Sequence, residues 1–235
     1  INSFVPSEAV RTAATAIAWQ KPFIDSFPRP TGAALADGTA PFITTTTNPA
    51  SLDATSLRID QRSGSVGLFG RYNYSPSSAT KRSVGYDTVS NTKLTTATAG
   101  LTHSVSSRMV NEFRLNYSKN IVNGVSEGSS LGGATPLTDS SLPTGTTFAT
   151  GLVGYQIISL TGAAAIGPTY GTTGENTSTQ YNLTDTLSMS LGTHQFKAGF
   201  DYRRLTPTMQ SPNVWLTAAF VGMTGVGGVA SGVPG

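Results

Sequence analysis

The sequence predicts an all-β fold of antiparallel up-and-down hairpins, with long loops and one short helix near the N-terminus. Two observations predict it. Several segments alternate apolar and polar residues with the period of two that sends successive strand side chains to opposite faces. In addition, only 11% of the 235 residues are charged, against about 25% in an ordinary soluble domain. Gly, Ser, Thr and Asn supply the polarity instead, which favours strands with uncharged loops over a helical bundle.

Composition also excludes several classes of function. The net charge of +3 is small and the 15 basic residues are scattered, so the sequence gives no sign of nucleic-acid binding. There is no cysteine for a disulfide or a thiolate metal site. His103 and His194 stand alone, and no HExxH, phosphate-binding or nucleophile-elbow motif accompanies them. We therefore expect no catalytic site, no metal and no cofactor.

The chain is expected to divide into three regions. Residues 1–53 are predicted to be a loop region with a short helix at 7–20, in which Ser7 caps the helix and Pro22 stops it. Residues 54–204 are predicted to form the β-structure. Residues 205–235 read as a Gly-rich loop. The first residue is not Met and the last stretch has no closing element, so both ends are expected to be cut from a longer protein.

Three hairpins are predicted, at about 54–75, 93–120 and 177–204. The stretch "THQFKAGFDYRR" illustrates the pattern, with aromatic and apolar residues on one side and charged residues on the other. Phe69 and Asp185 are exceptions to it. For Asp185 we expect either a β-bulge that shifts the register or a position near a membrane interface.

The connections are predicted to alternate between short and long. Turns inside each hairpin take a few residues, whereas loops are expected at 75–92, at 121–176 and after 204. Within the second loop, "LVGYQIISL" is a candidate for an extra strand. Because neighbouring strands are antiparallel, all short turns would lie at one end of the sheet. This asymmetry is typical of outer-membrane barrels, whose strands need alternation over only about 10 residues rather than an apolar run of about 18.

The charged residues of the predicted strands fall on the face opposite the apolar one. In a transmembrane β-barrel this face would line a wet lumen, because Arg or Lys on a lipid face costs about 2–4 kcal/mol at midplane. The carboxylates each have Arg nearby, so we expect cross-strand ion pairs rather than acid–base catalysis. The predicted lumen-lining residues are Arg58, Asp60, Arg71, Glu112, Arg114, Lys197, Asp201 and Arg203.

A set of tyrosines lies on the apolar face, near the strand ends that are remote from the short turns. In a barrel they would belong to the aromatic girdle at the membrane interface. In a soluble sandwich they would be tyrosines at the edge of the core. The predicted girdle residues are Tyr72, Tyr74, Tyr117 and Tyr202.

Several short motifs resemble the barrel domain of TonB-dependent outer-membrane transporters, and most closely the Oar-like group, whose longer members carry a carboxypeptidase-regulatory-like domain. The resemblance covers about residues 25–210 and lies in "FPRPTG", "LRIDQRSGSVGLFGRYNYSPSS", "VNEFRLNYS" and "LTDTLSMSLGTHQFKAGFDYRRLTP". It implies a fragment of a barrel that is occluded by a plug domain, in the bacterial outer membrane. It also implies uptake of a scarce solute, such as a siderophore, an oligosaccharide or a peptide.

The resemblance further implies two partners, the lipid of the outer membrane and the TonB complex, which would act through a plug region outside this sequence. Neither the solute nor the direction of transport follows from the residues. A second hypothesis is a soluble or surface-anchored β-sandwich that serves as an adhesin or carbohydrate-binding module. In that case the aromatic face would fill a core between two sheets.

Overall fold

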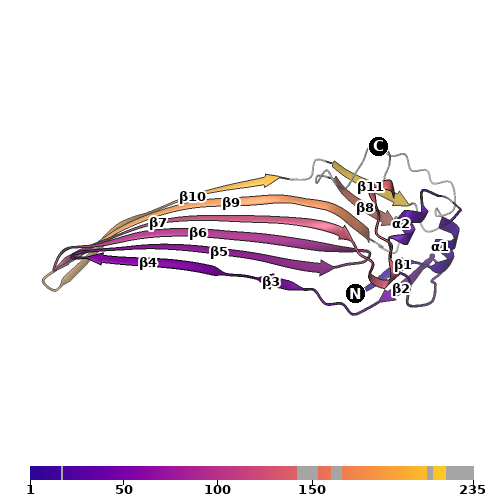
Figure 1. The fold of residues 1–235 in the computed structure, drawn as a ribbon, viewed down its shortest axis with the longest axis horizontal. Helices are drawn as coiled ribbons and strands as arrows, with labels where there is room; N and C mark the ends of the chain where they lie inside the picture. Colours follow the sequence, from indigo (N-terminus) through magenta and orange to yellow (C-terminus); the bar gives the residue numbers. More distant parts are fainter. Residues whose placement is uncertain (17, 142–152, 160–165, 211–213, 221–235) are drawn as a thin grey trace.

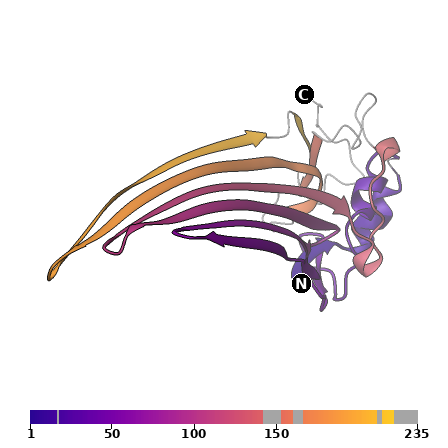
Figure 2. The same ribbon diagram turned by 60° about the vertical axis from the view of Figure 1, so that its left-hand side comes forward.

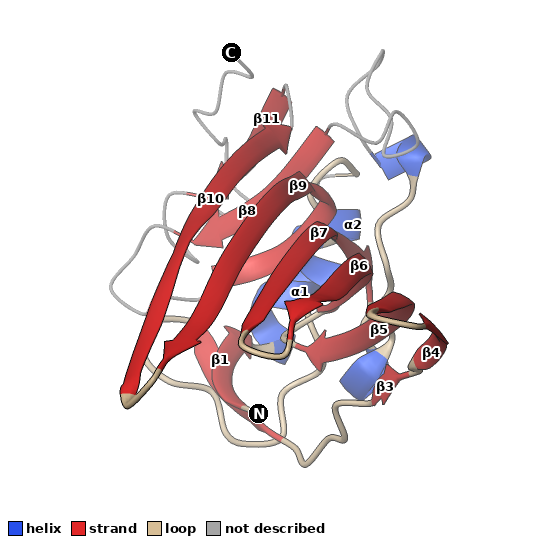
Figure 3. Ribbon diagram, turned by 90° about the vertical axis from the view of Figure 1, so that its left-hand side faces the viewer, coloured by secondary structure: helices blue, strands red, loops and turns tan. Residues whose placement is uncertain are grey.

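The computed structural model describes residues 1–235 apart from 17, 142–152, 160–165, 211–213 and 221–235. Long strands form one curved sheet, and a small unit of helices and short strands packs at one end of it (Figure 1). Viewed along the strands, β4 to β10 form a single layer (Figure 3). No helix within the described residues is long and apolar enough to cross a membrane.

The sheet has nine strands in the order β11-β8-β9-β7-β6-β5-β3, with β10 also paired to β9 and β4 to β5. All pairs are antiparallel except β11 with β8. The strands are β3 Ala50–Leu52, β4 Thr55–Ser63, β5 Val66–Arg82, β6 Tyr86–Ser106, β7 Met109–Gly128, β8 Val153–Ser159, β9 Ile166–Leu191, β10 His194–Gln210 and β11 Val214–Phe220.

The three predicted hairpins are confirmed as β4–β5, β6–β7 and β9–β10. Each closes through a two-residue turn at the end of the sheet remote from the helices (Figure 2). Gly64 and Gly192 occupy turn positions with φ of 56° and 59°. This left-handed conformation suits glycine and the primed turns whose twist matches the flanking strands.

The predicted loop at 75–92 is wrong. Strands β5 and β6 continue through it, paired without interruption from Val66 opposite His103 to Arg82 opposite Asp87. Only residues 83–85 connect them, with Gly85 at a φ of 78°. The segment is rich in Ser, Thr and Asn on both faces, so it lacks the alternation that marks a strand. Its backbone nevertheless completes the same hydrogen-bond ladder.

The loop predicted at 121–176 is also shorter than expected. Strand β7 runs to Gly128, β9 begins at Ile166, and the proposed extra strand is confirmed as β8. The remainder of that prediction, at 142–152 and 160–165, lies outside the described residues. In the same way β10 and β11 occupy part of the predicted Gly-rich loop, and residues 221–235 lie outside the described part. The sheet itself begins with β3, before the predicted boundary at residue 54.

The small unit comprises β1 Asn2–Pro6, α1 Glu8–Ala14, α2 Lys21–Asp25 and β2 Thr39–Ile43. Ser7 caps α1 as predicted, since its side chain accepts a hydrogen bond from the Val10 amide. A single helix over 7–20 is wrong, because Pro22 lies in the first turn of α2 rather than ending a helix. Proline is well tolerated there, where its missing amide hydrogen has no intrahelical partner.

The buried hydrophobic core lies in this small unit and not along the sheet. It includes residues from the unit itself and Val84, Leu137 and Tyr170 from the adjoining end of the sheet. The unit is therefore packed onto the sheet, a feature the sequence does not indicate. The core residues contributed by the unit are Val5, Val10, Ala14, Phe23, Ile24, Phe27 and Phe42.

Polar contacts hold the small unit together and join it to the segment after β7. The buried Arg11 guanidinium donates to the carbonyl oxygens of Phe27 and Pro28, at 2.7 and 2.5 Å, and desolvation lowers its pKa. Two backbone hydrogen bonds join the unit to the segment after β7, from Arg29 N to Gly132 O and from Thr135 N to Asp25 O, both at 2.8 Å. Apolar packing and hydrogen bonds thus both join the small unit to this end of the sheet.

Candidate functional site: the polar face of the sheet

The strand register sorts the side chains of β4 to β10 into two faces, because residues directly opposite each other in neighbouring strands point to the same side. We call one side the polar face and the other the apolar face. Two adjacent rows define the polar face. The first is Asp60, Phe69, Gly100, Arg114, Thr184 and Asp201, and the second is Arg58, Arg71, Thr98, Asn116, Asn182 and Arg203.

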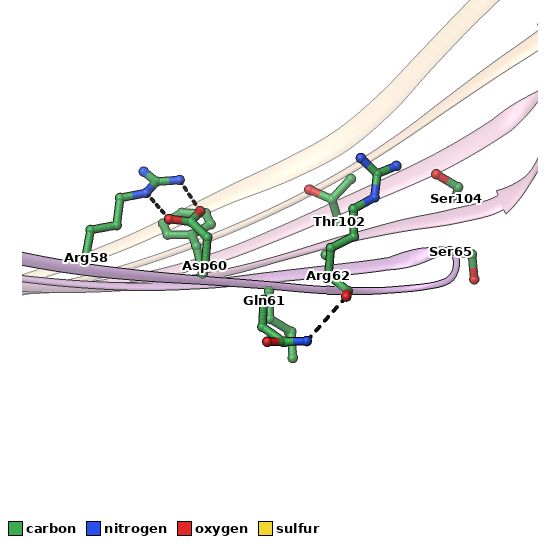
Figure 4. Close-up of a pocket in the computed structure, with 10 residues that line it drawn as sticks. Arg58, Asp60, Gln61, Arg62, Ser65, Thr102 and Ser104 are labelled. Atoms are coloured by element: carbon green, nitrogen blue, oxygen red, sulfur yellow. Dashed lines mark hydrogen bonds and ion pairs between the residues drawn. The ribbon is translucent and has the colours of Figure 1, made fainter.

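All eight predicted lumen-lining residues lie on the polar face. Six belong to the two rows above, and Glu112 and Lys197 lie opposite Thr186 and Ser188 on the same side. Figure 4 shows Arg58, Asp60 and Arg62 projecting together from β4, whereas Gln61 points the other way. The register therefore confirms that these charges share one face, while the solvent that this face meets remains a prediction.

The expected cross-strand ion pairs of Asp60 and Asp201 are wrong, and Glu112 forms no ion pair among the described residues. The one ion pair between neighbouring strands in the described part of the sheet, Arg82 with Asp87 at 3.0 Å, lies outside the predicted set. Arg58 forms a bidentate pair with Asp60 at 2.7–2.8 Å, two residues along its own strand. Asp201 pairs in the same way with Arg203, at 2.9 Å. The register explains this outcome, because it places Arg71 rather than an acid opposite Arg58. Residues i and i+2 of a strand share a face, so the long arginine side chain reaches the carboxylate along the strand.

Hydrogen bonds between amides, hydroxyls and carboxylates link the strands instead. The Asn182 side chain donates to Asp201 at 2.5 Å, across β9 and β10. Asn73 donates to Thr96 and Asn116 donates to Thr98, each at 2.7 Å. These bonds join β5, β6 and β7 to one another, and β9 to β10.

Phe69, the exception to the alternation, lies at the centre of the polar face. Its ring covers Gly100 on β6, where an added Cβ would come within 2.1 Å of the ring. The Arg58 guanidinium lies 4.5 Å from the ring centroid and that of Arg114 lies 5.8 Å away. Both distances allow a cation–π attraction. The Phe69 ring thus contacts two guanidinium groups on the polar face. The register of β5 is continuous at this residue, so Phe69 does not mark a β-bulge.

Two shallow hollows flank Phe69. One opens toward the short turns and is lined by residues that include Arg58, Asp60, Arg62 and Thr102 (Figure 4). The other includes Arg71, Arg114, Asn116 and Asn182.

Among the described residues, no carboxylate forms an ion pair with Arg71 or Arg114. Guanidinium groups bind carboxylates and phosphates through two parallel hydrogen bonds. The surface can therefore hold an anionic or hydroxyl-rich molecule without covalent chemistry.

The apolar face carries the predicted girdle tyrosines. Tyr72 and Tyr117 lie in one row, Tyr202 one row nearer the short turns, and Tyr74 one row farther away. Tyr181 joins them, with its ring centroid 5.3 Å from that of Tyr117. The prediction left out Tyr181, although its parity and its distance from the turn give the same signal.

Asp185 stays on the apolar face, opposite Phe113 on β7 and Phe200 on β10. The register is continuous there, so the bulge considered for this position is absent. The carboxylate accepts a hydrogen bond of 2.8 Å from the Asn111 side chain. The Asn111 side-chain amide therefore satisfies the Asp185 carboxylate on the apolar face, and no change in register is needed.

Comparison with protein families identifies this architecture. A family model described as an outer membrane beta barrel domain matches residues 2–229. Comparisons with curated proteins and with solved structures give no match. The family match covers nearly the whole chain, and its description places the protein in the bacterial outer membrane. The chain thus belongs to the outer membrane beta barrel domain family.

Proposed function

We propose that the chain forms part of the wall of a TonB-dependent transporter, with the apolar face toward lipid and the polar face toward a water-filled lumen. The exposed fractions support this orientation. Leu57, Ile59 and Phe200 are 62%, 65% and 53% exposed, although they are large and apolar. Lipid would cover them, and the segregation of arginine onto the other face avoids about 2–4 kcal/mol for each cation placed at the membrane midplane.

The stepping of the short turns supports a tilted barrel wall. The last pairs before the turns are Leu191 with His194, Ser106 with Met109, and Ser63 with Val66. In the register of the sheet each hairpin ends one row, or two residues, beyond its neighbour. Figure 2 shows the turns stepped in this order, with the β9–β10 turn extending farthest. Successive rows are about 6.8 Å apart along a strand, and strands two positions apart in the sheet are separated by about 9.6 Å. The turns therefore lie level at a strand tilt of about 35°, within the range of barrel strands.

The same tilt gives the height of the apolar band. From Met109 at the turn to Tyr117 is eight residues of β7, or about 27 Å of strand and about 22 Å along the membrane normal at this tilt. The apolar band of such barrels is about 25 Å tall. Beyond Tyr117, β7 continues for eleven more residues to Gly128. We propose that this extension and the small unit stand on the extracellular side.

The polar face carries the functional part of the proposal. Arginine, asparagine and a central phenylalanine present donors and a flat ring, which suit a siderophore, an oligosaccharide or a peptide. Strands at both edges of the sheet lack a further partner among the described residues. Lipid does not tolerate open edges, so we propose that further strands complete the barrel. A plug would then occlude the lumen and contact TonB.

The experiment is nutrient-limited growth of a strain that lacks the gene. Iron chelates, cobalamin, oligosaccharides and peptides are each supplied as the limiting nutrient, in backgrounds with and without TonB. We expect growth on one of them to require both the intact gene and TonB. The variant Arg71→Gln/Arg114→Gln should reduce uptake of that nutrient several-fold, whereas the charge-matched Lys81→Gln/Arg108→Gln, which lies outside both hollows, should not.

Uptake that persists without TonB would indicate a passive channel instead. Growth that is independent of the gene on all four classes would contradict an uptake role. Equal losses in the two double variants would show that overall charge, rather than the residues around Phe69, governs transport.

A further inference from the structure

Three cations lie on the apolar face just beyond the tyrosines, on the side remote from the short turns. They are Lys93 on β6, Lys119 on β7 and Arg204 on β10. Farther from the turns the same face carries the Arg82–Asp87 ion pair and the carboxylates of Glu127 and Glu175. Lys93 lies opposite Pro76 and Ile121, and Lys119 opposite Thr95 and Thr179.

Arg204 lies opposite Tyr181. None of the three therefore has an acidic residue directly across from it. Asp53 lines the same surface hollow as Lys93, but no ion pair joins the two in the described part of the chain.

The register places these cations at one height. At the tilt given by the turns, a line parallel to the membrane plane moves away from the short turns by about half a row with each strand from β10 toward β4. It therefore moves one row between β10 and β7, which are two strands apart. Arg204 belongs to the row of Tyr117, and Lys119 lies one row higher. Lys93 lies in the row above that, one strand farther on. All three therefore fall within about half a row of a common level.

The tyrosines follow a parallel level one row nearer the short turns. From Tyr202 on β10 to Tyr117 on β7 the position moves one row away from the short turns, and from Tyr117 to Tyr74 on β5 it moves one row more. Tyr181 lies between Tyr202 and Tyr117 along this line. A cationic arc thus runs directly above an aromatic arc over the same strands. Aromatic girdles mark the boundary between hydrocarbon and headgroups, so the cations stand at the level of the headgroups.

We propose that Lys93, Lys119 and Arg204 form a docking surface for the phosphates of lipid A in the outer leaflet. This inference rests on the orientation of the sheet proposed above. Charge complementarity selects an anionic headgroup, and the spread of the arc selects a large one. Arg204 and Lys119 lie two strands and one row apart, or about 12 Å. A disaccharide with a phosphate at each end spans such an arc, whereas phosphatidylglycerol offers a single phosphate.

The test measures lipid retention by the complete barrel protein. The protein is reconstituted in phosphatidylcholine vesicles that contain bis-phosphorylated lipid A, dephosphorylated lipid A or phosphatidylglycerol. It is then re-extracted, and the retained lipids are counted by native mass spectrometry. We expect preferential retention of bis-phosphorylated lipid A, and a several-fold loss in Lys93→Gln/Lys119→Gln/Arg204→Gln. The control Arg62→Gln/Lys81→Gln/Arg108→Gln removes the same charge elsewhere and should retain lipid A normally.

Equal retention of phosphatidylglycerol, or an equal loss in both triple variants, would overturn the assignment to lipid A. So would unchanged retention in the arc variant. Spin labels at Phe113→Cys and Arg114→Cys test the orientation separately, because only the label at position 113 should contact lipid. If label 113 contacts lipid but the arc variant behaves as wild type, only this inference fails. If label 113 contacts water instead, the proposed orientation fails as well.

Discussion

At position 69 an aromatic ring stands on a face that is otherwise polar, and the reason lies on the neighbouring strand. Gly100 leaves the space that the Phe69 ring fills, and two guanidiniums lie near its centroid. Alternation within one strand reveals that Phe69 is exceptional but not why. The explanation requires the register, which pairs Phe69 with Gly100 and Gly100 with Arg114. A single strand sequence cannot supply that pairing.

The contact between Phe69 and Gly100 predicts the effect of one methyl group. Gly100→Ala should destabilise the protein by about 1–3 kcal/mol, because the added Cβ meets the ring and forces a rearrangement. Gly70→Ala is the matched control, since a Cβ there meets no atom within 4 Å. The measurement is urea unfolding in lipid vesicles. In Phe69→Ala/Gly100→Ala the penalty of the added methyl should disappear, and a penalty of unchanged size would contradict the proposed clash.

Asp185 gives a prediction of opposite sign. Asp185→Asn keeps an oxygen that can accept the hydrogen bond from Asn111 but removes a negative charge from the apolar face. We expect unfolding in vesicles to become less favourable by on the order of 1 kcal/mol, since a lipid-facing carboxylate costs less than a lipid-facing arginine but still carries a penalty. The same substitution in a water-exposed site would change little. A clear loss of stability in vesicles would instead indicate that Asp185 has a charged partner there.

At the scale of elements, the sequence predicts strands well where one face is apolar and poorly elsewhere. The halves of the three hairpins next to the short turns contain this alternation, and the structure confirms all three hairpins. In β5, β6 and β7 the halves remote from the short turns are rich in Ser, Thr and Asn, and their few apolar residues, such as Ile121 and Val122, follow no alternation. No periodicity therefore distinguishes these segments from loops. The small unit escapes prediction for another reason. Its core forms only when β1, β2 and the helices meet Val84, Leu137 and Tyr170 from distant parts of the chain.

The docking of the small unit depends on a backbone position at η1, Leu131–Gly133. Gly132 has a φ of 65°, and an added Cβ would lie 2.6 Å from the Phe42 ring. Gly132→Ala should therefore loosen the unit and speed proteolysis within residues 1–44, with the hairpins intact. Gly133→Ala is a close control, because its φ of 78° carries similar strain while its Cβ would meet no atom nearer than 3.5 Å. Equal proteolysis of the two variants would assign the effect to backbone strain alone.

Tyr170 makes the same docking sensitive to alkaline pH. Burial raises the pKa of its hydroxyl, and the Leu137 amide donates to its oxygen at 3.1 Å. Since the folded-state pKa is raised, the neutral form favours folding below the unfolded value of about 10. This stability is lost as the pH rises from there through the folded value. We expect proteolysis of the unit to accelerate over that range, and Tyr170→Phe, which has no hydroxyl to ionise, to remove the acceleration. A rate that is independent of pH in the wild type would contradict this.

For the whole molecule, the distribution of burial separates a membrane wall from a soluble sheet. The core lies in the small unit, whereas the long strands expose apolar side chains on one face and charges on the other. A β-sandwich would require a second sheet over the apolar face, and the described residues form a single layer there (Figure 3). The amphipathic alternation is compatible with both architectures. Only the number of layers distinguishes them, and the layers are set by pairings between distant strands.

This difference predicts how the chain behaves outside a membrane. In plain buffer the 235-residue chain should associate, because its apolar face and its unpaired strand edges are both open to contact with other molecules. Detergent should keep it dispersed by covering the apolar face. Size-exclusion chromatography with light scattering, with and without detergent, makes the measurement, and circular dichroism follows the strand content. The variant Phe113→Ser/Phe200→Ser should associate less in buffer, whereas a matched pair on the polar face, Thr98→Ser/Thr184→Ser, should behave as wild type. A monodisperse monomer with native strand content in plain buffer would contradict a lipid-facing sheet, because the exposed aromatic and aliphatic face would then need a protein cover that only a second layer can provide.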